Sequence, residues 1–127
     1  ENGSVLVIHH PPYLSANDPM AAAHGLMNSD ELYEIIVGSD VFAVLSGHTH
    51  QVSATTFGGI PHFTADSTAF GVAVDSEYMS INNRVGFAYC TAEDKHISVS
   101  HIAFDKELTT STRISISDLL KMMQVHA

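Results

Sequence analysis

The hydrophobic pattern of the first 45 residues predicts one strand–helix–strand unit. Residues 4–9 and 41–45 are short, nearly continuous apolar runs rich in β-branched residues, typical of parallel strands buried on both faces. Between them, apolar residues recur at helical spacing over residues 29–36, with Ser29 expected as the helix cap and Gly38 as the stop. This order predicts a βαβ unit with parallel strands and a right-handed crossover.

The later part of the chain has patterns typical of antiparallel strands. Residues 52–57 and 60–65 flank two consecutive glycines and predict a hairpin. Residues 85–91 and 97–104 predict a second pair, with one face exposed to water because apolar and polar residues alternate there. A short helix capped by Ser117 is expected near the end. The predicted fold class is mixed α/β, one βαβ unit followed by mostly antiparallel strands.

The composition narrows the class of protein. With 127 residues, 45% hydrophobic and 15% charged, the chain is expected to form one globular domain or part of one. Five Lys and Arg residues against a net charge of −9 argue against nucleic acid polymers and anionic membranes as partners. No apolar run approaches the roughly 18 residues of a membrane-spanning helix. Because Cys90 is the only cysteine, no internal disulfide is expected, and the predicted location is cytoplasmic.

Four of the nine histidines follow the two strands that are predicted to be parallel. His9 and His10 end the first strand, and His48 and His50 follow the second. Ligands bind at the carboxyl ends of strands in open α/β sheets. In extended backbone, His48 and His50 are expected to project to one side, and His10 to face away from His9. Because imidazoles suit Zn, Mn or Fe, we predict His9, His48 and His50 as metal ligands.

Three further residues are weaker candidates, either for substrate contact or for supporting the ligands. His10 is adjacent to His9, and His24 and Asn17 lie in the long segment 11–28. A loop of that length is often functional, for example as the rim of a site. A structural or solvated role, such as a turn, is the competing explanation for each of them.

Two motifs resemble a known enzyme family. VIHHPP (residues 7–12) and SGHTH (residues 46–50) are similar to the last two metal-binding motifs of the calcineurin-like metallophosphoesterases. The form HHPP, its spacing to GHTH and the following SATTFGGIPHFTADS most resemble the class III cyclic nucleotide (cAMP) phosphodiesterases and their glycerophosphodiesterase relatives. The resemblance covers residues 5–69.

The resemblance implies a site with two divalent ions, of Mn, Fe or Zn, in a four-layer αββα sandwich. His9 and His48 are then expected on one ion and His50 on the other, which makes them the catalytic residues. The implied reaction is the hydrolysis of a small phosphodiester, such as a 3′,5′-cyclic nucleotide, by a metal-activated hydroxide.

The DxH, GD and GNH motifs that precede HHPP in that family do not precede it in this sequence. The resemblance therefore implies that residues 1–104 are the C-terminal half of the domain and that residues 105–127 are a tail with a short helix. This half is expected to need the N-terminal half as partner and to have little activity alone. Its exposed strand edge favours association, for which a homodimer is one form.

Two other hypotheses stay open. In the first, three histidines hold a single zinc ion and leave one position for water. In the second, the chain is a non-catalytic half-domain that assembles with another chain, or an inactive remnant.

Overall fold

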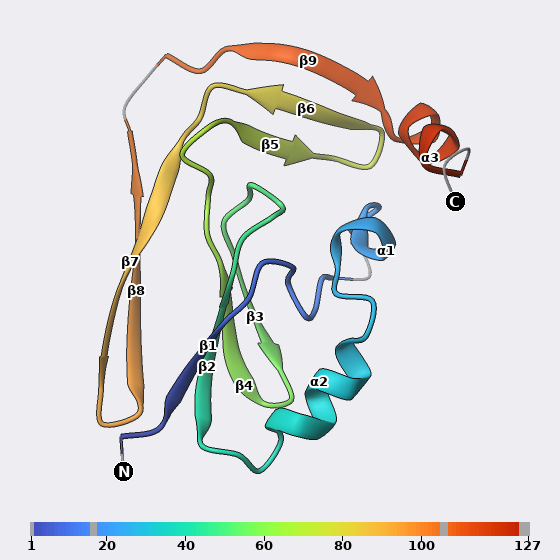
Figure 1. The fold of residues 1–127 in the computed structure, drawn as a ribbon. Coiled ribbons are helices and arrows are strands. Elements are labelled where there is room, and N and C mark those ends of the chain that lie inside the picture. Colours follow the sequence, from blue (N-terminus) through green and yellow to red (C-terminus); the bar gives the residue numbers. More distant parts are fainter. Residues whose placement is uncertain (1, 16–17, 105–106, 125–127) are drawn as a thin grey trace.

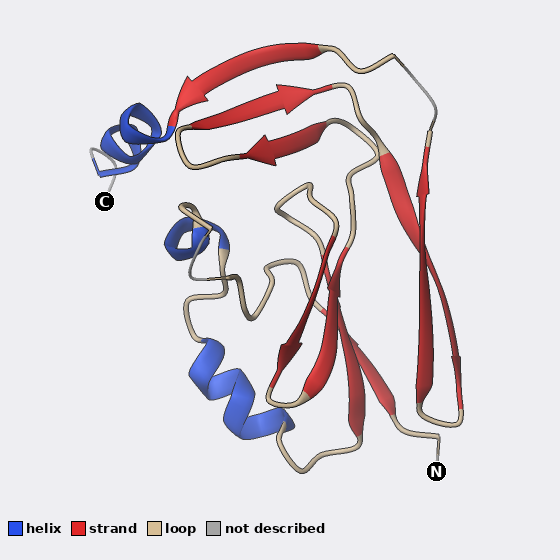
Figure 2. Ribbon diagram, turned by 180° about the vertical axis from the view of Figure 1, so that it is seen from behind, coloured by secondary structure: helices blue, strands red, loops and turns tan. Residues whose placement is uncertain are grey.

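The computed structural model describes residues 2–15, 18–104 and 107–124, and it confirms the mixed α/β class. These residues form three sheets and three helices (Figures 1 and 2). No helix in the described part of the chain is long and apolar enough to cross a membrane. In chain order the elements are β1 (Ser4–Val7), α1 (Ala21–His24), α2 (Ser29–Ile36), β2 (Val41–Ser46), β3 (Ser53–Phe57), β4 (Ile60–Thr64), β5 (Gly71–Val74), β6 (Tyr78–Asn82), β7 (Gly86–Glu93), β8 (His96–Ala103), β9 (Thr110–Ser115) and α3 (Ile116–Gln124).

The first sheet has the strand order β1-β2-β4-β3. Strand β2 runs parallel to both β1 and β4, and β3 and β4 form an antiparallel hairpin. The predicted parallel pair and the predicted hairpin are therefore both confirmed. In the register of β2 and β4, Ser46 lies opposite Thr64, so both strands end at the same edge of the sheet.

Helix α2 covers one face of this sheet, and the β7–β8 hairpin stands on the other side (Figure 1). Ile36 of the helix packs with Val44 and Phe57 of the sheet in the main core cluster. Strand β1 is not buried on both faces as predicted, since Val7 is 70% exposed. The reason is that β1 is an edge strand and Val7 borders a cavity beneath the hairpin.

The predicted helix of residues 29–36 is confirmed, but Ser29 is its first helical residue and not its cap. Asn28, rather than Ser29, occupies the N-cap position, and the cap makes no side-chain hydrogen bond to the backbone. The acidic residues Asp30 and Glu31 in the first turn favour the helix start through its dipole. Gly38 follows the C-cap with φ +79°, as expected of a residue that ends a helix.

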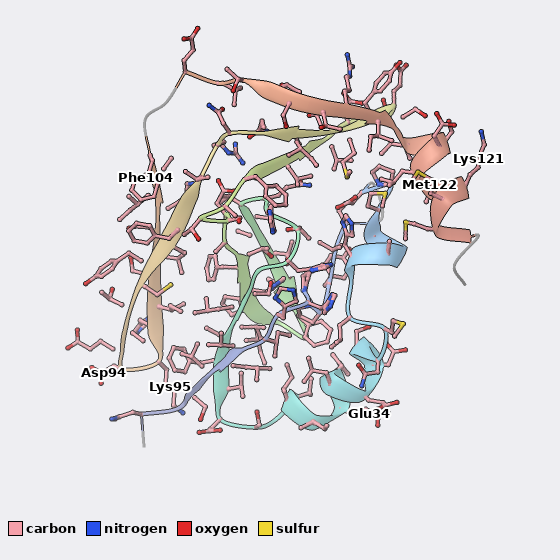
Figure 3. All side chains as sticks on the ribbon, turned by 45° about the horizontal axis from the view of Figure 1, so that its top comes forward. Glu34, Asp94, Lys95, Phe104, Lys121 and Met122 are labelled. Carbon is pink, nitrogen blue, oxygen red and sulfur yellow. The ribbon has the colours of Figure 1, made fainter. Side chains whose placement is uncertain are left out.

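The β7–β8 hairpin confirms the second predicted antiparallel pair. Asp94 and Lys95 form its two-residue turn at the tip, and both have positive φ (Figure 3). Ile97 and Val99 are half-buried, whereas Ser98 is exposed, so one face of the hairpin is solvated as predicted.

A third sheet, with the order β5-β6-β9, was not predicted. Strand β9 is largely polar and exposed, so its pairing with β6 depends on backbone hydrogen bonds rather than on an apolar pattern. Helix α3 follows it directly. The prediction that Ser117 caps this helix is wrong, because Ser115 Oγ accepts a hydrogen bond from the Asp118 amide and Ser117 lies inside the first turn.

Candidate metal centre

The backbone joins the two histidine segments at the edge of the first sheet. The Ile8 amide donates to the Leu45 carbonyl at 3.0 Å, which continues the pairing of β1 and β2. One step further, the Gly47 amide donates to the His9 carbonyl at 3.1 Å. The histidines that follow the two strands are therefore held beside one another, as the strand-end rule predicts.

Three imidazoles converge at this edge. The Nδ1 atom of His48 lies 3.0 Å from the Nε2 atom of His9. The ring of His10 is also close, with its centroid 4.0 Å from that of His48. His9, His10 and His48 each offer a ligand atom within 4.8 Å of the other two.

The expectation that His10 faces away from His9 is wrong. Strand β1 ends at Val7, so His9 and His10 lie in a bend where the alternation of side chains along a strand no longer applies. The Nδ1–H of His10 donates to the carbonyl of His24 at 3.3 Å. That bond leaves the Nε2 lone pair of His10 free to bind a ligand.

The extended backbone assumed for His48 and His50 is also wrong, although both side chains line the same cavity. Both have left-handed backbone conformations, with φ of 67° and 53°, rather than the extended conformation assumed. Left-handed conformations of residues other than glycine are uncommon and cluster at functional sites. The ring of His50 turns toward Phe70, with ring centroids 4.3 Å apart. Within the described residues, the three-histidine cluster therefore contains His10 and not His50.

Of the two weaker candidates in residues 11–28, one lies beside the cluster. The ring centroid of His24, the last residue of α1, is 5.5 Å from that of His48, so this histidine does reach the cluster. Its Nδ1 atom is buried and makes no hydrogen bond within the described part of the chain. Asn17 lies outside the described residues.

Burial and neighbouring charge favour the neutral form of two of these histidines. The pKa of His48 is below its usual value because burial disfavours the charged ring and because the adjacent imidazoles, His10 first among them, repel a second positive charge. Burial also lowers the pKa of His24, an effect that Asp18 opposes and His10 strengthens. Neutral imidazoles have the lone pairs that metal binding requires.

The three-histidine cluster fits a single divalent transition-metal ion. Two imidazole nitrogens on one tetrahedral zinc ion lie about 3.3 Å apart, given Zn–N bonds of roughly 2.05 Å. The 3.0 Å separation of the His9 and His48 nitrogens is close to that spacing. His10 also has the backbone carbonyl partner on its second nitrogen that metal-binding histidines usually have.

A cavity of about 520 Å³ opens beside the cluster, between the first sheet and β7. His9, His48 and His50 line it together with Asp66. Its size is within the range of small-molecule sites. The arrangement therefore places three imidazole rings at the wall of a cavity that can hold a small ligand.

Two residues beside the site were not predicted as part of it. Asp66 is buried and lines the cavity, and His62 is buried with Ser46 Oγ 2.7 Å from its Nε2 atom. A signal for Asp66 was present in the sequence. It follows the strand of residues 60–64, and β4 ends at the same sheet edge as β2, with Thr64 opposite Ser46.

The fold and the site together define a mixed α/β protein with a histidine cluster at the carboxyl edge of parallel strands. The chain is 35% identical over 89 residues to a protein of Rhodococcus erythropolis named as a probable cyclic nucleotide phosphodiesterase. It is 39% identical over 69 residues to a protein of Mycobacterium tuberculosis named as a cAMP/cGMP dual specificity phosphodiesterase. No family model matches the sequence.

These relatives are much longer than the chain. The first alignment covers 70% of this chain but 29% of the relative, and the second covers 54% and 21%. The similarity relates the chain to proteins named as phosphodiesterases over a part of their length.

Proposed function

We propose that this chain belongs to a metal-dependent phosphodiesterase that hydrolyses 3′,5′-cyclic nucleotides. The observation that carries the proposal is the convergence of His9, His10 and His48 in a chain whose relatives are named as cyclic nucleotide phosphodiesterases. The cavity beside these rings supports it, since its volume of about 520 Å³ suits a small substrate.

The proposal assigns two divalent ions, of Mn, Fe or Zn, to the complete site. His9, His10 and His48 are donors for one, and His50 is a donor for the other. A bound ion supplies a Lewis acid for a phosphoryl oxygen and lowers the pKa of a bound water. Carboxylate donors are expected from residues that this chain does not contain, namely from the N-terminal half of the same fold.

The chain's own residues hold and orient the donors. The bond from the Gly47 amide to the His9 carbonyl fixes the separation of the two histidine segments. The carbonyls of His24 and Phe70 fix the protons of His10 and His50 on Nδ1, which leaves each Nε2 lone pair available. Positions fixed before binding reduce the entropy that a catalytic site loses when substrate and ions bind.

The experiment uses the full-length natural protein. The protein is stripped with a chelator, reconstituted separately with Mn²⁺, Fe²⁺ or Zn²⁺, and assayed for hydrolysis of cAMP and cGMP. We expect metal-dependent activity that His48→Ala and His50→Ala each abolish and that His96→Ala, an exposed histidine of β8, retains. Near-normal turnover of His48→Ala or His50→Ala in metal-replete buffer refutes the assignment.

A mononuclear site is the second candidate, because His50 lies apart from the other three rings and bonds to Phe70 instead. Elemental analysis of the unchelated protein separates the two. Two ions per chain support the dinuclear site, and one ion that His48→Ala removes and His50→Ala retains supports the mononuclear site.

A further inference from the structure

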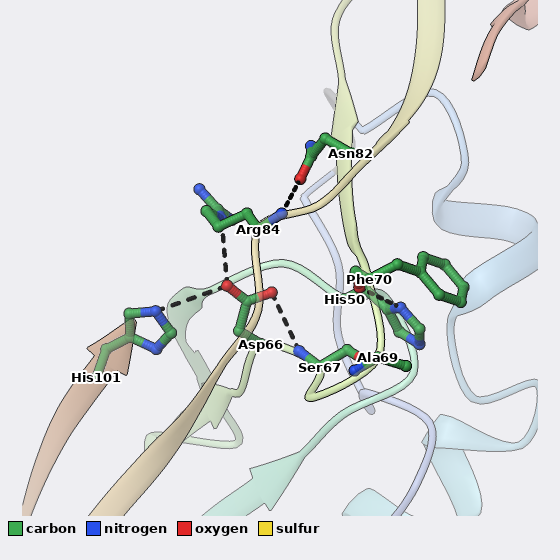
Figure 4. A network of polar contacts seen from close by, with 8 residues as sticks. All are labelled: His50, Asp66, Ser67, Ala69, Phe70, Asn82, Arg84 and His101. Carbon is green, nitrogen blue, oxygen red and sulfur yellow. Dashed lines mark hydrogen bonds and ion pairs between the residues drawn. The ribbon is translucent and has the colours of Figure 1, made fainter. Parts of the chain in front are cut away.

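Asp66 has a side chain with no exposed surface, close to the candidate metal centre (Figure 4). Its Oδ2 atom accepts a hydrogen bond from the Arg84 Nε at 3.1 Å and lies 3.6 Å from the His101 Nε2. A carboxylate is costly to bury unless it is paired. Asp66 therefore needs these partners, and through them the end of β4 is joined to the segment before β7 and to β8.

The second oxygen of Asp66 organises the turn that follows. Oδ1 accepts a hydrogen bond from the Ser67 amide at 3.1 Å, and Ser67 Oγ accepts one from the Ala69 amide at 3.0 Å. The Ser67 carbonyl accepts a further bond from the Gly86 amide at 2.9 Å. The turn of residues 66–70 is thus held from within and from the neighbouring strand β7.

The turn ends at Phe70, which makes two contacts with His50. The Phe70 carbonyl accepts a hydrogen bond from the His50 Nδ1 at 2.9 Å, and the two ring centroids are 4.3 Å apart. The His50 carbonyl in turn accepts a bond from the Val72 amide at 3.3 Å. The ring of His50 is therefore oriented, and its tautomer set, by the segment that Asp66 anchors.

From this chain of contacts we infer that Asp66 is a positioning residue for His50, acting through the 66–70 turn and the Phe70 carbonyl. The inference rests on the proposed function only in the use it gives to His50, whose free Nε2 is the donor required there. A purely structural ion pair, which fastens the β7–β8 hairpin to the sheet, is the competing explanation. It predicts a loss of stability without any change at His50.

The test is the tautomer of His50, measured in the metal-free protein by two-bond ¹H–¹⁵N correlation NMR of the imidazole nitrogens. We expect the Nδ1–H form to dominate in the wild type. In Asp66→Asn, which keeps the shape but removes the charge that holds Arg84, we expect the ratio of tautomers to fall by roughly fivefold, as for the loss of one ordinary hydrogen bond. The same samples are unfolded in urea, so that stability and tautomer are separated.

The chain offers a matched control. Asp75 Oδ1 also accepts backbone bonds, from the Glu77 and Tyr78 amides, and its other oxygen lies 4.0 Å from an Arg113 nitrogen. Because this turn does not contact His50, Asp75→Asn should leave the His50 signals unchanged. Arg84→Gln, at a side chain that is 46% exposed, tests the same inference if Asp66→Asn does not fold.

A wild-type His50 spectrum in a folded Asp66→Asn or Arg84→Gln variant overturns the inference, whatever the change in stability. Failure of the proposed function gives a different result. In that case the tautomer shifts as expected in the variants, while Mn²⁺ or Zn²⁺ added to the wild-type protein leaves the His50 signals unperturbed.

Discussion

The Nδ1 atom of His48 lies 3.0 Å from the Nε2 atom of His9, although 39 positions separate the two residues in the sequence. The contact is made possible by β1 and β2, which run parallel and end together. Neither ring alone makes a metal site, but two nitrogens at this separation are nearly in position to share one ion.

Removal of the His48 ring should therefore abolish tight metal binding. We expect His48→Ala to weaken binding of Zn²⁺ or Mn²⁺ by about 100-fold or more, since loss even of an outer-shell partner commonly costs about 10–100-fold. Isothermal titration calorimetry measures the affinity directly. His96→Ala removes an exposed imidazole at the start of β8 and should leave the affinity unchanged. Equal affinities for His48→Ala and the wild type would contradict a site at this edge.

His10 is either a third ligand of the ion or a neighbour that only supports the other two histidines. Its ring lies 4.0 Å from the His48 ring, and its Nδ1 is bonded to the His24 carbonyl. If His10 binds the ion through Nε2, His10→Ala should weaken binding as much as His48→Ala does. We expect His10→Ala to weaken binding by as much as His48→Ala, because the free nitrogen of His10 belongs to the cluster. A loss of less than about tenfold in the same titration assigns His10 a supporting role instead.

Added metal should also stabilise the fold. An ion that binds only the native state at 100 times its dissociation constant contributes about 2.7 kcal/mol. We expect Zn²⁺ to raise the melting temperature of the wild-type protein and excess chelator to reverse the rise, as followed by circular dichroism. The shift should disappear in His9→Ala, because that variant lacks one of the two nitrogens that lie 3.0 Å apart. A persistent shift in His9→Ala locates the stabilising ion elsewhere.

The strand-end histidines show how much of the site the sequence predicted. The continuous apolar runs and the intervening helical pattern correctly identified β1, α2 and β2, and parallel strands necessarily bring His9 and His48 to one edge. The double-glycine turn likewise identified the β3–β4 hairpin. These features are local in the sequence or follow from a single topological rule.

The orientation of the other rings was not predictable in the same way. His10 lies past the end of β1, and His50 has a left-handed φ of 53°, so neither follows the alternation of an extended strand. The direction of the His50 ring depends on the Phe70 carbonyl, twenty residues away. Such contacts result from tertiary packing, which hydrophobic periodicity does not encode.

His62 should make the stability of the protein depend on pH. The imidazole is 1% exposed, and its two nitrogens lie 2.7 Å from Ser46 Oγ and 2.8 Å from Thr55 Oγ1. Burial lowers its pKa from 6.5 to about 4. Between these values the unfolded chain takes up a proton that the folded chain does not, so stability is present above pH 6.5 and is lost as the pH falls toward 4. The loss amounts to about 3 kcal/mol, at 1.36 kcal/mol for each pKa unit.

Urea unfolding at pH 7.5, 6.5, 5.5 and 4.5 measures this dependence. His62→Gln has no titrating ring, so its free energy of unfolding should be lower than that of the wild type at pH 7.5 and should fall less steeply toward pH 4.5. Parallel curves for the two proteins would show that the buried ring is not responsible. The NMR signal of the His62 ring provides a direct check, since it should not titrate above pH 5.

The turn of the β7–β8 hairpin contains backbone strain that glycine can relieve. Lys95 has φ +63° in a two-residue turn whose other member, Asp94, also has positive φ. Turns of this type favour glycine, because a side chain in the left-handed region is sterically disfavoured. We expect Lys95→Gly to raise the free energy of unfolding by about 0.5–1 kcal/mol, the relief of strain exceeding the added entropy of the unfolded chain. Lys95→Ala removes the same charge but keeps a Cβ atom, so it should give no such gain in urea unfolding. Equal stabilisation by both variants would assign the effect to the charge of Lys95, and stabilisation by glycine alone assigns it to the left-handed backbone.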